Sequence, residues 1–252
     1  MTNILGIPMY DSPLAELLST IRRTCSDPAE PRRGRLVSLT GAHGLVHARH
    51  HAEFRETLEA FDYNLPDGLP GVWVGRYLKG ATSMEQIRGA DFFRHVMSAT
   101  AADPIRHYLC GGKDGVAERL AEVCAQRFGN ANVCGTHSPP FRPMTDADWD
   151  ELVARIDASG ADIVWVGLST PKQELFAREL AKRVRVHYLV TIGAAFDFHT
   201  GAMPEAPRVL RKAGLEWAYR TWREPRRLAR RYAEVVPLFL LYNALDMLGK
   251  ER

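Results

Sequence analysis

The sequence predicts an α/β fold: a Rossmann-like parallel sheet with helices on both faces, plus a helical C-terminal appendage. Short apolar runs alternate with amphipathic helical stretches, which is the pattern of strands joined by crossover helices. Continuously apolar strands are typical of parallel sheets, because such strands are buried on both sides. Beyond Phe198 the pattern is helical only. We therefore expect a core over residues 1–201 and a basic, helical appendage over residues 202–252.

Each element follows from its local pattern. A short N-terminal helix leads into a polar loop, rich in Pro and Arg, over residues 22–34. Extended or apolar runs predict strands over residues 36–40, 63–66, 105–110, 132–135, 162–168 and 188–192. The helices predicted between them cover residues 43–60, 69–78, 91–100, 115–128, 146–158 and 171–184. Because ligands of such sheets bind outside the carboxyl ends of the strands, the residues directly after each strand are the functional candidates.

Composition places the chain among globular proteins and locates its positive charge. The 252 residues are 46% hydrophobic and 25% charged, which excludes an intrinsically disordered chain. The net charge is only +3, but residues 203–234 hold nine Arg or Lys and four Glu, so that segment carries +5 and the remainder −2. A local excess of this kind indicates an anionic partner: a nucleic acid, a membrane surface or a phosphorylated ligand.

The lack of a recognisable targeting signal and the spacing of the cysteines favour a cytoplasmic location. Residues 1–18 lack the basic start and apolar centre of a signal peptide. No apolar run reaches the ~18 residues of a spanning helix, and the nearest, residues 235–248, is interrupted by Asn243 and Asp246. The four cysteines show no C-x-x-C spacing, which disfavours disulfides and structural zinc. We expect a cytoplasmic protein whose C-terminal segment lies on a membrane or pairs two copies in a homo-oligomer.

Two turns at predicted strand ends are candidate ligand sites. The sequence GGKDG at residues 111–115 can cradle a diphosphate with backbone N–H groups. It is neither a P-loop nor a dinucleotide fingerprint, and a tight turn explains it equally well. In LPDGLP, residues 65–70, a rigid turn presents Asp67, which can act as general base for a sugar hydroxyl. From spacing alone, a turn-forming Asp-Gly is the simpler interpretation.

Two patterns suggest metal sites, and each has a simpler interpretation. Asp146-x-Asp148 resembles the D-x-D site of sugar-nucleotide transferases, but Thr145 with Asp148 fits a helix cap, which we favour. Histidines at positions 43, 47 and 51 share a helix face with zinc-compatible spacing. Solvated histidines are the favoured interpretation, except for His43, which lies next to a strand end.

The donors most suited to phosphate or sugar oxygens are in residues 169–174 and in the basic segment. Pro171 suits the first helical position, which brings Lys172 and Gln173 close to the sheet edge. The basic arginines fall largely on one side of a continuous helix, although Pro225 can restart it: Arg220, Arg223, Arg227, Arg230 and Arg231. Arginine forks bind phosphate oxygens in bidentate fashion, whereas a solvated face paired with glutamates is the alternative.

Seven motifs in a fixed order resemble one family. They are L-P-D-G-L-P at 65–70, R-G-x-D at 88–91, L-x-G-G at 109–112, the stretch 167–174 with P-K-Q-E, G-A-A-F-D-F-x-x-G at 193–201, A-P at 206–207, and G-L-E-W-x-Y-R at 214–220 followed by E-P-R-R at 224–227. Each is weak alone. Together they resemble the WecG/TagA/CpsF glycosyltransferases (glycosyltransferase family 26) over residues 36–232.

The resemblance implies an inverting, metal-independent glycosyltransferase without a cofactor. Such enzymes move a hexosyl or N-acetylhexosaminyl group from a UDP-sugar to a polyprenyl-diphosphate-linked sugar, in bacterial exopolysaccharide or cell-envelope polysaccharide biosynthesis. The expected partners are these two substrates and the inner face of the cell membrane, where the protein would be peripheral. No nucleic acid is expected.

The resemblance also suggests roles for individual residues. Asp67 is implied as the general base. The expected contacts are Thr40, Gly111, Gly112, Gln173 and Asp197 for the donor, His43, Arg88 and Lys172 for the rest of the pocket, and Arg220, Arg227 and Arg230 for the acceptor diphosphate. Many members carry Asn two residues before the position of His43, where this chain has Gly41. Thr40 and His43 are the candidates to replace that contact, and the donor sugar stays open.

Two other classes of protein are consistent with parts of the sequence. A nucleic-acid-binding protein would use the Arg-rich helix, whose interleaved Trp217, Tyr219 and Trp222 suit base stacking. That interpretation leaves the residues at the strand ends without a role. A nucleotide-sugar epimerase or dehydrogenase is disfavoured by the missing dinucleotide fingerprint.

Overall fold

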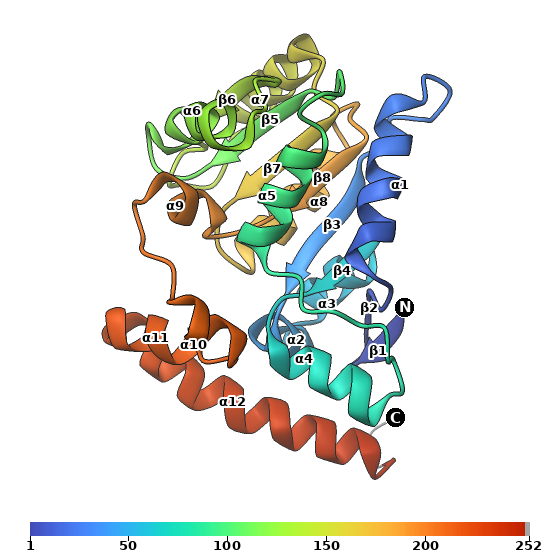
Figure 1. Ribbon diagram of the computed structural model, residues 1–252, viewed down its shortest axis with the longest axis vertical. Coiled ribbons are helices and arrows are strands. Elements are labelled where there is room, and N and C mark those ends of the chain that lie inside the picture. The colour runs from blue at the N-terminus through green and yellow to red at the C-terminus, as the bar shows by residue number, and fades with distance from the viewer. Residues whose placement is uncertain (250–252) are drawn as a thin grey trace.

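The computed structural model describes residues 1–249, apart from the side chains of Lys212 and Arg227. Its centre is an eight-stranded sheet in the order β1-β2-β4-β3-β8-β7-β5-β6 (Figure 1). The strands are β1 (Thr2–Ile4), β2 (Ile7–Met9), β3 (Arg35–Thr40), β4 (Tyr63–Pro66), β5 (His107–Gly111), β6 (Val133–His137), β7 (Ile163–Gly167) and β8 (Tyr188–Thr191). The β1–β2 pair is antiparallel and the other neighbouring pairs are parallel.

Helices form a layer on each face of the sheet. One layer contains α1 (Leu14–Ser26), α5 (Gly89–Ala99), α6 (Val116–Phe128) and α9 (Ala195–Thr200). The other contains α2 (Ala42–His50), α3 (Ala52–Glu59), α7 (Asp146–Ser159) and α8 (Lys172–Ala181). A short helix α4 (Leu69–Trp73) continues into a π-helix η1 (Val74–Leu78) after β4.

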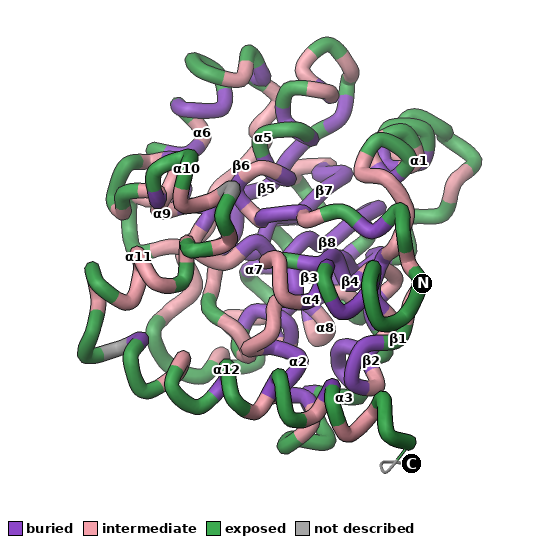
Figure 2. Tube along the Cα trace, turned by 60° about the horizontal axis from the view of Figure 1, so that its bottom comes forward, coloured by how far each residue is buried: buried purple, intermediate pink, exposed green. Residues whose placement is uncertain are grey.

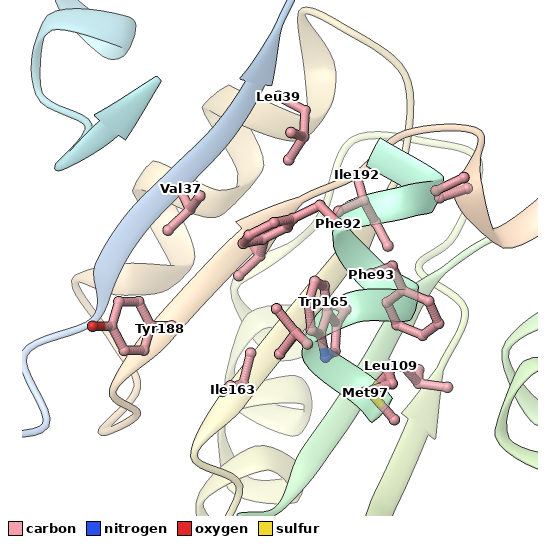
Figure 3. Close-up of a cluster of buried hydrophobic side chains, with 14 of the residues drawn as sticks. Val37, Leu39, Phe92, Phe93, Met97, Leu109, Ile163, Trp165, Tyr188 and Ile192 are labelled. Atoms are coloured by element: carbon pink, nitrogen blue, oxygen red, sulfur yellow. The ribbon is translucent and has the colours of Figure 1, made fainter. Parts of the chain in front are cut away.

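The core between α5 and the sheet is built from large aromatic side chains. Phe92 and Phe93 on α5 pack against Trp165 on β7, with the Phe93 and Trp165 rings 4.8 Å apart (Figure 3). The Trp165 indole Nε1 donates to His107 Nδ1 at 3.2 Å. Burial lowers the pKa of His107 to about 3, so its ring stays neutral and can accept this bond. These contacts fix β5 and β7 relative to each other, and the carboxyl ends of both strands reach the site described below.

The predicted fold class is confirmed, and the six predicted strands correspond to β3 through β8. Two local predictions were wrong, and one element was missed. The loop expected from residue 22 begins only after Ser26, and the helix expected over 43–60 is interrupted at His51. The β1–β2 hairpin was not predicted, because strands of three residues show no readable alternation. Its two-residue turn has positive φ at both Leu5 and Gly6, as a tight hairpin requires.

The C-terminal helices lie along one side of the core. They are α10 (Arg208–Lys212), α11 (Glu216–Arg223) and α12 (Pro225–Met247), and the predicted boundary at 201/202 falls between α9 and α10. In Figure 1, α12 runs along the lower edge, below α2 and α4. Val235 and Phe239 of α12 are buried against side chains of α2, α3 and α4, and Lys79 pairs with Asp246 near the end of α12. None of the helices in residues 1–249 is long and apolar enough to cross a membrane.

Candidate active site

A cavity of about 1800 Å³ lies between the carboxyl edge of the sheet and the C-terminal helices. One wall comes from the ends of β3, β4, β5, β7 and β8, and the opposite wall from α11 and α12. The predicted site residues that line it are Thr40, His43, Asp67, Arg88, Gly112, Lys172, Gln173, Asp197 and Arg220. The fold thus brings together residues that are up to 180 positions apart in the sequence.

Asp67 is placed by backbone contacts at the end of β4. Its N–H donates to the carbonyl of Thr40 on β3 at 3.1 Å. Gly68 follows with φ of +106°, a conformation that side chains rarely adopt, and this turns the chain into α4. A Cβ at Gly41 would lie only 2.6 Å from the Asp67 carbonyl oxygen. In this chain a side chain at residue 41 would therefore require the turn that carries Asp67 to shift.

The surroundings of Asp67 raise its pKa to about 7. Asp67 is exposed to the water of the cavity, but it lies deep among protein atoms. The loss of hydration at this depth is the largest cause of the raised pKa. The negative charge of Glu216 raises the pKa further, while Arg88, Arg220 and a hydrogen bond from the Gly89 backbone lower it. A carboxylate that titrates near neutral pH is suited to accept a proton during catalysis.

Arg88 joins the core to the C-terminal helices. Its guanidinium Nε and Nη2 donate to the two carboxylate oxygens of Glu216 at 2.8 and 3.0 Å, and Nη1 donates to Asp91 at 2.8 Å. Arg88 is almost fully buried. Three of its five N–H groups are bonded to protein carboxylates, so Arg88 holds α11 in place and puts a positive charge beside the site.

Gln173 lies at the cavity wall with its carboxamide bonded inside the protein. Its Oε1 accepts from the Gly193 backbone N–H at 2.9 Å, and its Nε2 donates to Glu174 Oε1 at 2.9 Å. These bonds hold the turn after β8. Glu174 was not predicted as a site residue: it lines the cavity, its Oε2 has no hydrogen-bond partner among the described residues, and burial raises its pKa. The P-K-Q-E motif contained it, but sequence alone did not show that it would be buried.

The glycine turn after β5 differs from the predicted diphosphate cradle. Gly111 does not line the cavity, since it packs against β7 so closely that a Cβ would lie 2.5 Å from the Gly167 carbonyl oxygen. The Gly112 N–H, which was expected to face a diphosphate, donates instead to that same carbonyl at 3.0 Å. Gly112, Lys113 and Asp114, which connect β5 to α6, line the cavity.

The C-terminal helices contribute a different set of cations from the predicted one. Arg220 lines the cavity with its guanidinium 5.6 Å from the centre of the Phe198 ring. Arg230 is exposed and lies outside the lining, whereas Arg231 lies inside it. Arg227 is in α12, but its side chain lies outside the described part of the structure. The helix ends at Arg223 and a new one begins at Pro225, so α11 and α12 are separate helices.

The structure shows the surroundings of the three spaced histidines and of Asp148, the two patterns that suggested metal sites. Burial, the charge of Arg231 and His47 lower the pKa of His43 to about 4. His47 stacks between His43 and His51, and no group of three metal-ligating side chains gathers in residues 1–249. Asp148 closes a capping box with Thr145 at the start of α7 and pairs with Arg142. The predicted helix cap is therefore confirmed.

Comparison with known protein families agrees with this geometry. The model of the glycosyl transferase WecG/TagA/CpsF family matches residues 2–252. The chain belongs to this family. It is therefore a glycosyltransferase of cell-envelope polysaccharide synthesis, and the match extends beyond the 36–232 segment that carries the motifs.

Proposed function

We propose that this glycosyltransferase moves a hexosyl or N-acetylhexosaminyl group from a UDP-sugar to a sugar on a polyprenyl diphosphate, with inversion and without a metal. The observation that carries the proposal is the position of Asp67. Its carboxylate has a pKa near 7 and lies in a cavity with strand ends on one side and arginines on the other. This arrangement provides a base, a donor side and an anion-binding acceptor side in one enclosure.

In the proposed reaction, Asp67 removes the proton from the acceptor hydroxyl. The hydroxyl oxygen attacks the anomeric carbon of the donor from the face opposite UDP, forming the new C–O bond. The bond between the anomeric carbon and the UDP oxygen breaks, and its electron pair leaves with UDP. A single displacement of this kind inverts the anomeric configuration, and the proton stays on Asp67 until solvent removes it.

The leaving diphosphate needs positive charge, and Lys113 would supply it. Lys113 lines the cavity in the connection between β5 and α6, a helix of 13 residues. The N-terminus of such a helix carries partial positive charge and unpaired N–H groups, which favour anions. Stabilisation of the charge that develops on the leaving group is commonly a large part of the rate enhancement, and here protein groups would provide it in place of a metal.

The acceptor and the membrane would meet the C-terminal helices. Arg220 and Arg231 line the cavity and suit the acceptor diphosphate. Arg223, Arg226 and Arg230 are exposed and suit anionic lipid headgroups at the inner face of the cell membrane. Trp217 packs against Tyr232 at the cavity, with ring centres 5.6 Å apart.

The decisive experiment is transfer in vitro. The protein is incubated with a panel of UDP-sugars and a short-chain polyprenyl-diphosphate sugar, with and without EDTA, and the product anomer is assigned by NMR. We expect one UDP-sugar to give an inverted product at a rate that EDTA does not change. A retained configuration, or activity restored only by Mn²⁺ or Mg²⁺, would contradict the proposed mechanism.

A further inference from the structure

One face of α12 changes from charged to apolar along its length. The residues of α12 that line the cavity are Arg231, Tyr232, Val235, Val236, Phe239 and Leu240. They recur at four-residue spacing, so they form one face of the helix. From Arg231 to Leu240 this face extends about 14 Å at the rise of an α-helix. The charged end of this face lies near Asp67. The charges of Asp67, Arg220 and Arg231 all influence the pKa of Tyr232, which is on this face.

Apolar side chains from α4 and η1 line the cavity beside this face. Trp73, Val74, Tyr77 and Leu78 contribute to the lining, as do Val236 and Leu240 of α12. We call these six residues the apolar channel. In Figure 1, α4 and η1 lie beside α12 on the same side of the sheet edge.

The apolar channel opens to the surface. Tyr77 is 78% exposed, Leu240 65% and Trp73 50%, whereas Val74 is buried. Figure 2 shows α12 with buried positions at intervals and exposed positions between them. Large apolar side chains that line an open channel, and do not fill a core, mark a site for an apolar ligand.

We propose that the apolar channel binds the first isoprene units of the lipid-linked acceptor, while Arg220 and Arg231 bind its diphosphate. This rests on the proposed function, since it assigns a subsite of the same cavity. The acceptor is linear: sugar, diphosphate, then isoprenoid chain. Along α12 the cavity lining passes from Arg231 to Val236 and Leu240, so a charged part is followed by an apolar part. This succession matches the diphosphate and the isoprenoid chain of the acceptor.

The channel is distinct from a general membrane-binding face. Leu241, Met247 and Leu248 are also exposed on or just after α12, but they do not line the cavity. Contact with a bilayer would involve these residues regardless of what the cavity holds. If the acceptor KM depends on the length of the isoprenoid chain when no bilayer is present, that dependence comes from the channel and not from membrane contact.

The test compares two acceptors with the same diphosphate sugar, one with a single isoprene unit and one with three. Transfer is measured in detergent-free solution below the critical micelle concentration of each acceptor. We expect the wild-type KM to be at least tenfold lower for the three-isoprene acceptor, because burying a few CH₂ groups is enough for a factor of about ten. The variants Leu240→Asp and Tyr77→Asp should remove most of this difference while kcat for the single-isoprene acceptor stays within about twofold.

Leu241→Asp is the matched control, since it introduces the same charge one residue along α12 and outside the lining. It should leave both KM values unchanged. Equal wild-type KM values for the two acceptors would overturn the channel, as would equal effects of Leu240→Asp and Leu241→Asp. Absence of transfer to either acceptor from every UDP-sugar would instead contradict the proposed function itself, so the two failures are distinguishable.

Discussion

The two walls of the cavity are held in place by different forces. On the wall formed by strand ends, Asp67 is fixed by backbone bonding to β3, and the turn at Gly193 is fixed by Gln173. The wall formed by α11 and α12 is attached through side chains: the Arg88–Glu216 fork and the burial of Val235 and Phe239. Chemistry needs the rigid geometry of the first wall. In the proposed function, the second wall, which is attached separately, recognises the long acceptor.

This comparison predicts that changes at the strand ends affect kcat, whereas changes on the C-terminal helices affect acceptor KM. The largest effect is expected for Asp67→Asn. The amide keeps the size of the side chain but cannot accept the hydroxyl proton, and loss of a general base typically lowers the rate by ~10²–10⁴. Turnover should fall by this amount while the Kd of UDP, measured by calorimetry, changes only a few-fold. Turnover close to wild type would exclude Asp67 as the base.

The next largest effect is expected for Arg220→Ala on the opposite wall. One charge-assisted hydrogen bond to a diphosphate is worth roughly 1.5–3 kcal/mol, or about ten- to a hundredfold in acceptor KM. Arg230→Ala is the matched control, since Arg230 is exposed and outside the cavity lining. We expect steady-state kinetics to show the KM increase for Arg220→Ala only. If Arg230→Ala had the larger effect on acceptor KM, the assignment of the acceptor side would be wrong.

The same difference between the walls explains what the sequence could predict. The strand ends were predictable because apolar runs locate the strands, and a parallel sheet brings their carboxyl ends to one edge. Asp67, Gln173 and Asp197 were therefore placed in one cavity from pattern and resemblance alone. The resemblance also covered motifs in the C-terminal helices, but the orientation of these helices depends on where they break.

Which arginines face the site could not be predicted in detail. The spacing favoured Arg220, Arg227 and Arg230, but Arg231 lines the cavity and Arg230 does not. Hydrogen bonds that satisfy Gln173 and Gly112 within the protein were also invisible, since sequence does not reveal which donors are already taken. A solvated face paired with glutamates was the alternative for the basic segment, but Glu216 binds buried Arg88 and influences the pKa of Asp67.

Glu216 gives a third prediction, on the coupling between the walls. Asp67 must be ionised to act as base, so activity should rise with pH through its pKa of about 7. Glu216 helps raise that pKa, so Glu216→Gln should favour the ionised form and move the acidic limb of the kcat profile to lower pH. Glu205→Gln is the control, because Glu205 pairs with Arg211 away from this cavity. A limb that stays in place, or moves to higher pH, would mean that the walls are not coupled through this charge.

The smallest effect is expected at the start of α7, and it separates a helix cap from a metal site. Thr145 accepts a hydrogen bond from the Asp148 N–H at 3.3 Å, and the Asp148 carboxylate accepts from the Thr145 N–H at 2.7 Å. Losing a cap of this kind costs about 1 kcal/mol, so Thr145→Ala should lower the free energy of unfolding in urea by that amount. Asp148→Ala removes the other half of the capping box and the partner of Arg142, so it too should lower stability.

Both variants should keep wild-type kcat with and without EDTA, because neither residue lines the cavity. A D-x-D metal site predicts a different pair of results: Asp148→Ala would lose activity while Thr145→Ala would not. Equal, small losses of stability in the two variants, with unchanged turnover, therefore identify the pair as a structural cap.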